Sequence, residues 1–244
     1  MKKHPILVTW TLLCLIVTLS VNYFLPVSRN VSDVANALNN EIEPAGYAFA
    51  IWGLIYVLMA IWIIRAYFVR GYQQELYGKV LGWTSINLLF NGLWVISYGS
   101  GQIIVSLAII VVILLTLIMI YRIISVNNEE VKPFMRLPIS LYMGWVSVAT
   151  IINVFNVFTD RGIESFLFLD EIAWTIIMLV IGWLLAFTLM KRFDDIIYPL
   201  PFIWAYVAIY VESTNMYVQY VSLGLAIVVG LFVLYQVILR LKNR

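Results

Sequence analysis

Long apolar runs separated by short polar segments dominate the pattern of hydrophobic and polar positions along the chain. Eight runs can be recognised, at Ile6–Leu25, Tyr47–Val69, Gly78–Tyr98, Gln102–Ile124, Leu137–Phe158, Glu171–Met190, Ile197–Val211 and Tyr217–Leu239. A helix needs about 20 mostly apolar residues to cross the hydrocarbon core of a bilayer, whereas the strands of a membrane barrel alternate apolar and polar positions. Val105–Met119 shows no such alternation. The pattern therefore predicts an all-α, polytopic membrane protein with about eight transmembrane helices.

The composition also indicates that most of the protein surface faces lipid rather than water. Of the 244 residues, 63% are hydrophobic and 11% are charged, whereas a water-soluble domain carries roughly a quarter of charged residues. The lipid bilayer is therefore the expected partner of most of the surface. The net charge of +2 reflects basic connections between helices and indicates no nucleic-acid partner.

Basic residues are unevenly distributed between the two ends of the predicted helices. All of the 15 basic residues except Arg29 and Arg161 lie on the side that holds both termini. Because basic loops stay in the cytoplasm, both termini are predicted to be cytoplasmic. An even number of spans follows, and eight satisfies it.

The connections between the runs differ in length. Gly99–Gly101 is almost a bare turn, so the third and fourth spans should form an antiparallel hairpin, and Ser213–Met216 should join the last two spans in the same way. The exception is the polar segment Pro26–Pro44, in which a few apolar positions predict a short amphipathic turn. A lid over a site and a simple solvated connector both fit this segment.

Amides and aromatic side chains recur at helical spacing inside three of the runs. The three stripes comprise Trp52, Tyr56, Met59 and Ile63 in the second span; Trp83, Asn87, Asn91, Trp94 and Tyr98 in the third; and Tyr142, Trp145, Ala149, Asn153 and Asn156 in the fifth. An amide facing hydrocarbon without a partner costs several kcal/mol, so the stripes should face the bundle interior and each other. The spacing fits a ligand pocket and hydrogen-bonded packing between helices equally well.

The same residues resemble a known family. Trp52 to Met59, WGLIYVLM, is similar to the W-x-x-x-Y-x-x-M core of the tryptophan-rich sensory proteins, the bacterial relatives of the mitochondrial translocator protein. Pro44 to Phe49, PAGYAF, resembles the family's entry to the second helix. Asn91 to Trp94, NGLW, and Leu141 to Trp145 followed by Asn153 resemble its elements in the third and fifth helices.

The resemblance covers about residues 1–158 and implies a five-helix core. It does not explain residues 159–244, whose apolar runs predict three additional C-terminal transmembrane helices. It also implies a multi-pass protein of a bacterial cell membrane that acts as a receptor or carrier for a flat hydrophobic ligand, with protoporphyrin or haem favoured, in sensing, transport or porphyrin homeostasis. The implied ligand-binding residues are Trp52, Tyr56, Asn87, Asn91, Trp94, Tyr142, Trp145, Ala149 and Asn153, and the implied lid or entry residues are Pro44, Tyr47 and Phe49. No further cofactor is required, and the added helices could serve as a homodimer surface.

Other functions are weighed by the chemistry that the residues allow. The only histidine, His4, lies beside Lys2 and Lys3 outside the core, so no hydrolytic triad is expected, and neither a metal site nor a phosphate-cradling glycine loop is predicted. The one enzymatic reaction left open is light-dependent breakdown of a porphyrin through Trp52 and Trp145. A secondary transporter of another small hydrophobic molecule is the third hypothesis, motivated by Pro199, Pro201 and Glu212 at the two ends of the short seventh run.

Overall fold

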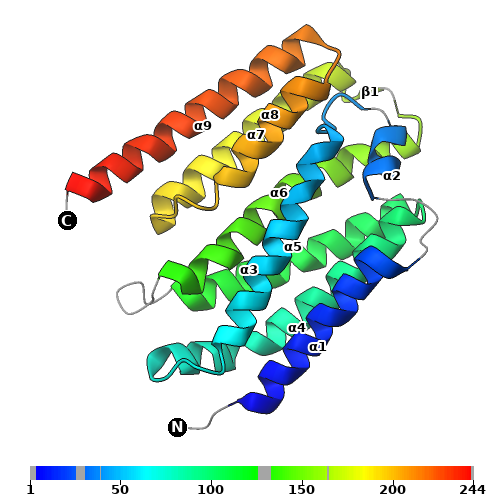
Figure 1. Ribbon diagram of the computed structural model, residues 1–244. Helices are drawn as coiled ribbons and strands as arrows, with labels where there is room; N and C mark the ends of the chain where they lie inside the picture. The colour runs from blue at the N-terminus through cyan, green and yellow to red at the C-terminus, as the bar shows by residue number, and fades with distance from the viewer. Residues whose placement is uncertain (1–3, 26–30, 39, 126–132, 164, 243–244) are drawn as a thin grey trace. The chain divides into compact units, whose positions relative to one another are not determined.

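The computed structural model (Figure 1) describes residues 4–25, 31–38, 40–125, 133–163 and 165–242. Its elements are α1 (Pro5–Phe24), α2 (Val31–Leu38), the 3-10 helix η1 (Gly46–Ala50), α3 (Ile51–Arg65), α4 (Tyr72–Gly99), α5 (Ile103–Ser125), α6 (Pro133–Asp160), β1 (Ser165–Phe166), β2 (Leu169–Asp170), α7 (Glu171–Phe193), α8 (Leu200–Glu212) and α9 (Met216–Lys242). The two strands form an antiparallel hairpin in which Ser165 is opposite Asp170. The all-α prediction is confirmed.

Each of the eight predicted apolar runs contains one apolar helix. The helix in the seventh run, α8, is shorter than the others. Within the described residues, seven helices are long and apolar enough to cross a membrane. The run at Ile197–Val211 forms α8, which has only 13 residues and rises about 20 Å, less than the roughly 30 Å of a hydrocarbon core. Pro199 precedes the helix, Pro201 lies in its first turn, and Glu212 ends it with an exposed side chain. Both prolines therefore occupy positions at which a helix tolerates them.

The polar segment before α3 also contains the short helix that its pattern predicts. α2 has eight residues and buries Val34 and Ala35. Residues 26–30 and 39 of this segment lie outside the described residues.

The chain forms two compact units. Unit 1 contains Met1–Val31 and Ala50–Val146, and unit 2 contains Ser32–Phe49 and Ser147–Arg244. The division therefore falls inside α6, whose first part belongs to unit 1 and whose second part belongs to unit 2. The sequence-based boundary at residue 158, which marks the end of a family core rather than of a compact unit, stays a prediction.

Unit 1 is held together by close helix pairs. α4 and α5 pack as the predicted hairpin, joined by a turn in which Gly101 has a φ of +74°, a conformation that glycine adopts without strain. α1 packs on α4 (Figure 1) through small hydroxyl residues: Thr18 Oγ1 donates to the Leu88 carbonyl at 2.7 Å, and the hydroxyls of Thr11 and Ser85 are 2.9 Å apart. Small residues of this kind allow helices to approach closely in lipid.

Unit 2 joins the segment before α3 to the last helices. α9 packs on α8 and α7. The Ala45 amide donates to the Ala208 carbonyl of α8 at 3.2 Å, and Trp204 Nε1, also on α8, donates to the Ala48 carbonyl at 2.9 Å. The segment at residues 40–49 is therefore fixed to α8 by main-chain as well as side-chain contacts.

Gly182 on α7 allows a close contact with α8 in unit 2. A Cβ atom at this position would lie 2.6 Å from Tyr206 Oη and 3.4 Å from the Phe202 ring. Tyr206 Oη donates to the Leu179 carbonyl at 2.6 Å, so it cannot retreat without losing that bond. We expect Gly182→Ala to lower the free energy of unfolding by about 1–3 kcal/mol, measured by thermal unfolding in detergent.

Gly230→Ala on α9 is the matched control for this substitution. A Cβ atom there would have no described heavy atom within 4 Å, and alanine favours a helix over glycine by about 1 kcal/mol. Gly230→Ala should therefore be neutral or stabilising. A Gly182→Ala protein as stable as Gly230→Ala would contradict the packing described for α7 and α8.

Candidate functional site

Trp52 on α3 lies at the centre of a group of aromatic side chains in unit 1. Its ring stacks on Tyr56 with 5.7 Å between ring centroids and 21° between planes, and it lies 5.8 Å from Trp94, 5.8 Å from Tyr142 and 6.4 Å from Trp145. These distances fall in the range of favourable aromatic pairs. We call these five residues the Trp52 cluster. All five are buried, and they confirm that part of each of the three stripes faces the other two. Trp83, at the start of the third-span stripe, is 40% exposed and does not take part.

Asn91 on α4 connects two members of the cluster by hydrogen bonds. The Tyr56 hydroxyl donates to Asn91 Oδ1 at 2.8 Å, and Asn91 Nδ2 donates to the Tyr142 hydroxyl at 2.9 Å. The Tyr56 hydroxyl also lies 3.3 Å from Asn22 Oδ1 on α1. Sequence reasoning did not identify Asn22, although an amide inside an apolar run was the signal that could have done so.

Trp94 carries the polar group of this cluster that is still open to a ligand. The residue is 3% exposed, and its ring stacks on Tyr98 at 5.3 Å. Within the part of the chain that the structure describes, its indole Nε1–H has no hydrogen-bond acceptor. A buried donor of this kind is uncommon and calls for an explanation, and a ligand that offers an oxygen atom would supply one.

Asn87 belongs to the same stripe but makes different contacts. Its Nδ2 donates to the Ile113 carbonyl at 3.0 Å and to Thr116 Oγ1 at 2.8 Å, both on α5. These are the packing contacts between helices that the sequence left open as an alternative to a pocket. Its membership of a ligand site stays a prediction.

The remaining predicted site residues belong to unit 2. Asn153 Nδ2 donates to the Ala149 carbonyl of its own helix at 3.1 Å. Pro44 is buried and Phe49 half-buried, whereas Tyr47 is 45% exposed and meets Trp204 edge-on at 5.4 Å. Within unit 2 the entry residue Tyr47 therefore contacts α8 while it stays partly exposed.

Two acidic residues fix the segment before η1 in unit 2, and sequence reasoning did not assign them this role. The Glu41 carboxylate accepts hydrogen bonds from the Thr214 amide at 3.1 Å, the Asn215 amide at 3.2 Å, Thr214 Oγ1 at 2.7 Å and the Ser213 hydroxyl. Partial burial raises the pKa of Glu41, but these hydrogen bonds outweigh it, so the pKa of this carboxyl is lowered. Glu41 thus ties the segment to the turn between α8 and α9.

Glu43 differs from Glu41 because its side chain is buried, with 3% exposed. Burial raises the pKa of Glu43 to about 8; the Asn156 side chain beside it acts in the opposite direction, and the charge of Glu212 adds to the increase. Asn156 Oδ1 also accepts a hydrogen bond from Asn40 Nδ2 at 2.7 Å. The Glu43 carboxyl is therefore neutral near pH 7. With Asn40 and Asn156 it forms a cluster of polar side chains that joins the segment to α6.

The side chains of the Trp52 cluster and Asn91 offer two kinds of contact to a ligand. Aromatic faces offer stacking, and the amide of Asn91 and the indole of Trp94 offer polar contacts that orient a ligand. Across the described residues, no group of three or more His, Cys, Asp or Glu side chains could hold a metal ion.

The comparisons with known proteins give one family. A family model described as TSPO-like protein matches residues 6–235, which extends well past the residues 1–158 that carry the sequence resemblance. No curated protein and no solved structure gives a significant match. The match includes the three stripes, every member of the Trp52 cluster and most of the last three helices. This chain therefore belongs to the TSPO-like protein family.

Proposed function

We propose that this protein is a membrane receptor or carrier that binds a flat hydrophobic ligand at the Trp52 cluster, and that the ligand is a tetrapyrrole such as protoporphyrin or haem. The observation that carries the proposal is the arrangement around Trp52. Four aromatic rings surround its indole, and the buried N–H of Trp94 has no acceptor among the described residues. Aromatic planes with few polar groups are typical of sites for such ligands.

Packing within the cluster limits how a planar ligand can bind. Carbon atoms in contact are about 3.5–4.0 Å apart, so a ring inserted between two others needs a gap of about 7 Å. Trp52 and Tyr56 are nearly parallel with centroids 5.7 Å apart. The macrocycle therefore stacks on an outer face of the cluster or displaces a ring, and either mode changes the environment of several tryptophans.

The polar groups then set the orientation of the ligand. The Trp94 N–H suits an oxygen of a propionate or carbonyl group. Giving this unpaired buried donor an acceptor favours the bound state by about 1–3 kcal/mol. His4, the only histidine, precedes the first turn of α1 at Pro5, away from the cluster on α3, α4 and α6. Recognition should thus depend on the macrocycle plane, and protoporphyrin and haem should bind with similar affinity.

The proposed site lies in a membrane, with a defined orientation of the chain. Among the described residues, seven helices are long and apolar enough to cross a membrane. With the shorter apolar helix α8 as an eighth crossing, the chain is an integral membrane protein with an even number of spans. Its basic residues support an orientation with both termini in the cytoplasm, in a bacterial cell membrane. The lipid bilayer and the tetrapyrrole are the proposed partners, and pairing of two copies through the last helices is a further arrangement that crosslinking in membranes would test.

Titration of the purified protein with protoporphyrin, and separately with haem, tests the proposal. We expect saturable quenching of tryptophan fluorescence and a shift of the porphyrin absorption band. An aromatic contact is worth about 0.5–1.5 kcal/mol, so Trp145→Phe should weaken binding about two- to tenfold. Trp10→Phe is the matched control, because Trp10 is 52% exposed on α1. Quenching that never saturates, or equal affinity in all three proteins, would contradict a tetrapyrrole site at the cluster.

A further inference from the structure

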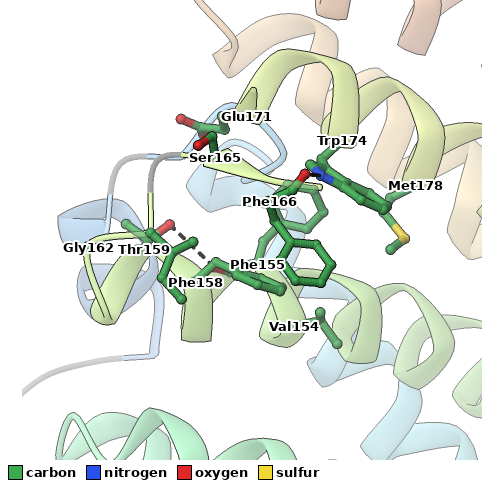
Figure 2. A pocket seen from close by; sticks show the side chains of 11 residues that line it. Val154, Phe155, Phe158, Thr159, Gly162, Ser165, Phe166, Glu171, Trp174 and Met178 are labelled. Carbon is green, nitrogen blue, oxygen red and sulfur yellow. Dashed lines mark hydrogen bonds between the residues drawn. The ribbon is translucent and has the colours of Figure 1, made fainter. Parts of the chain in front are cut away.

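Unit 2 contains a cavity of about 300 Å³ that is separate from the Trp52 cluster. The end of α6, the β1–β2 hairpin and the start of α7 enclose it (Figure 2). The side chains that carry the argument are Phe158 and Thr159 on α6, Phe166 on the hairpin, and Glu171 and Trp174 on α7. The volume is at the lower end of the range for small-molecule sites.

Three aromatic rings form a continuous wall of this cavity. Phe158 lies 5.5 Å from Phe166, which lies 5.8 Å from Trp174. Trp174 Nε1 donates to the Phe166 carbonyl at 2.8 Å, so the hairpin is fixed to α7 by a hydrogen bond as well as by ring contacts. The wall is thus built from two helices and a strand, and Phe166 is its central ring.

The turn of the hairpin is strained. Leu167 and Phe168, between the two strands, have φ values of 50° and 65°, in the left-handed region that costs a non-glycine residue roughly 1–2 kcal/mol. Their side chains are 64% and 105% exposed, so neither gains from burial within the chain. Strain of this kind persists where the surroundings over-determine the backbone, often at binding sites. The contacts of Phe166 with Phe158 and Trp174 provide those surroundings.

Among the residues that the structure describes, the lining of the cavity holds one carboxylate. Glu171 is exposed at the start of α7, and its Oε1 accepts a hydrogen bond from the Glu41 amide at 2.9 Å. Within the ranges that the structure describes, no basic side chain lies within 4 Å of it. The cavity therefore combines an aromatic wall with one negative charge that has no counterion in the described part of the chain.

We propose that this cavity binds a small organic cation: an ammonium group carried by a short apolar or aromatic body. An ammonium ion is attracted to aromatic faces and to a carboxylate, and both contacts strengthen when water is excluded. A neutral ligand would leave the charge of Glu171 unused, and an anion would be repelled by it. The two sources of such a cation are a free amine and the ethanolamine headgroup of a lipid, since α6 and α7 are both long enough to span the membrane.

Binding of 4-phenylbutylammonium and of 4-phenylbutanol, its neutral analogue, to protein in maltoside detergent tests the proposal by calorimetry. We expect the amine to bind at least fivefold more tightly than the alcohol. Glu171→Gln should abolish this preference and leave the affinity for the alcohol unchanged, because glutamine keeps the acceptor for the Glu41 amide. Val154 on α6 also lines the cavity (Figure 2). Val154→Trp, which fills the cavity, should remove saturable binding of both compounds, and an unchanged melting temperature shows that each variant is folded.

Two results would overturn the proposal: an amine affinity unaffected by Glu171→Gln, or saturable binding that survives Val154→Trp. The source of the cation is a separate measurement. A short-chain phosphatidylethanolamine that displaces the amine, while the matching phosphatidylglycerol does not, would identify the lipid headgroup. Displacement by neither lipid would identify a free amine. Both of these outcomes support an organic-cation site.

Discussion

Replacing Glu43 with glutamine is expected to remove a large pH dependence of stability. In the unfolded chain this carboxyl loses its proton near pH 4.5, whereas in the folded protein burial keeps it protonated up to about pH 8. Between these values the folded state binds more protons than the unfolded state, so stability falls as the pH rises. The slope is about 1.4 kcal/mol per pH unit, and it levels off once the folded carboxyl is itself ionised.

Melting temperatures in detergent from pH 5 to pH 9 measure this effect. Near pH 5 the natural protein and Glu43→Gln should have similar stability, because both side chains are then neutral and of similar size. Toward pH 8 the natural protein should become progressively less stable than the variant. Glu43→Asp, which keeps a carboxyl group, should retain a pH-dependent loss. Parallel curves for the natural protein and Glu43→Gln would mean that Glu43 is already ionised in the folded state.

Trp52→Ala is the second substitution with a large expected effect. The indole contacts four other rings and is 9% exposed, and truncating a buried tryptophan leaves a cavity that its neighbours fill only partly. We expect the free energy of unfolding to fall by about 3–5 kcal/mol. Trp10→Ala, at an exposed position of α1, should change it by less than about 0.5 kcal/mol. Denaturation followed by circular dichroism compares the two proteins.

Addition of indole separates cavity formation from general misfolding. A cavity lined by aromatic rings binds small apolar molecules that fit it, and a ligand that binds only the folded state raises stability. Indole should therefore raise the melting temperature of Trp52→Ala and leave the natural protein and Trp10→Ala unchanged. The absence of rescue, together with a small loss of stability, would contradict the central position of Trp52 in unit 1.

The positions of the helices could be read from the sequence because lipid makes helix formation a local matter. With no water in the bilayer core, every backbone polar group must be satisfied within its own segment. An apolar run bounded by polar residues therefore predicts its own helix, as Val105–Met119 does for α5. The run at Ile197–Val211 likewise contains its own helix, α8, which begins at Leu200 directly after Pro199.

Part of the Trp52 cluster was also accessible from the sequence. Spacing placed Trp52 and Tyr56 on one face of a helix, and the cost of exposing amides to lipid required Asn91 to face a partner. Spacing alone left open which helices would meet, and it gave Asn87 and Asn91 equal weight. In the structure Asn91 bridges Tyr56 and Tyr142, whereas Asn87 bonds α5. Residues at equivalent positions of one helix can be assigned different contacts only when the helices that pack against them are known.

The sequence by itself determined the membrane environment, the apolar helices and the family, because each depends on local hydrophobicity or on short motifs. Only the tertiary structure decided the burial of Glu43, the attachment of Glu41 to the turn after α8 and the aromatic wall beside Glu171. These features join residues far apart in the chain, such as Glu41 and Thr214. Local patterns carry no signal for such pairs, since the free energy that brings them together comes from packing of whole helices.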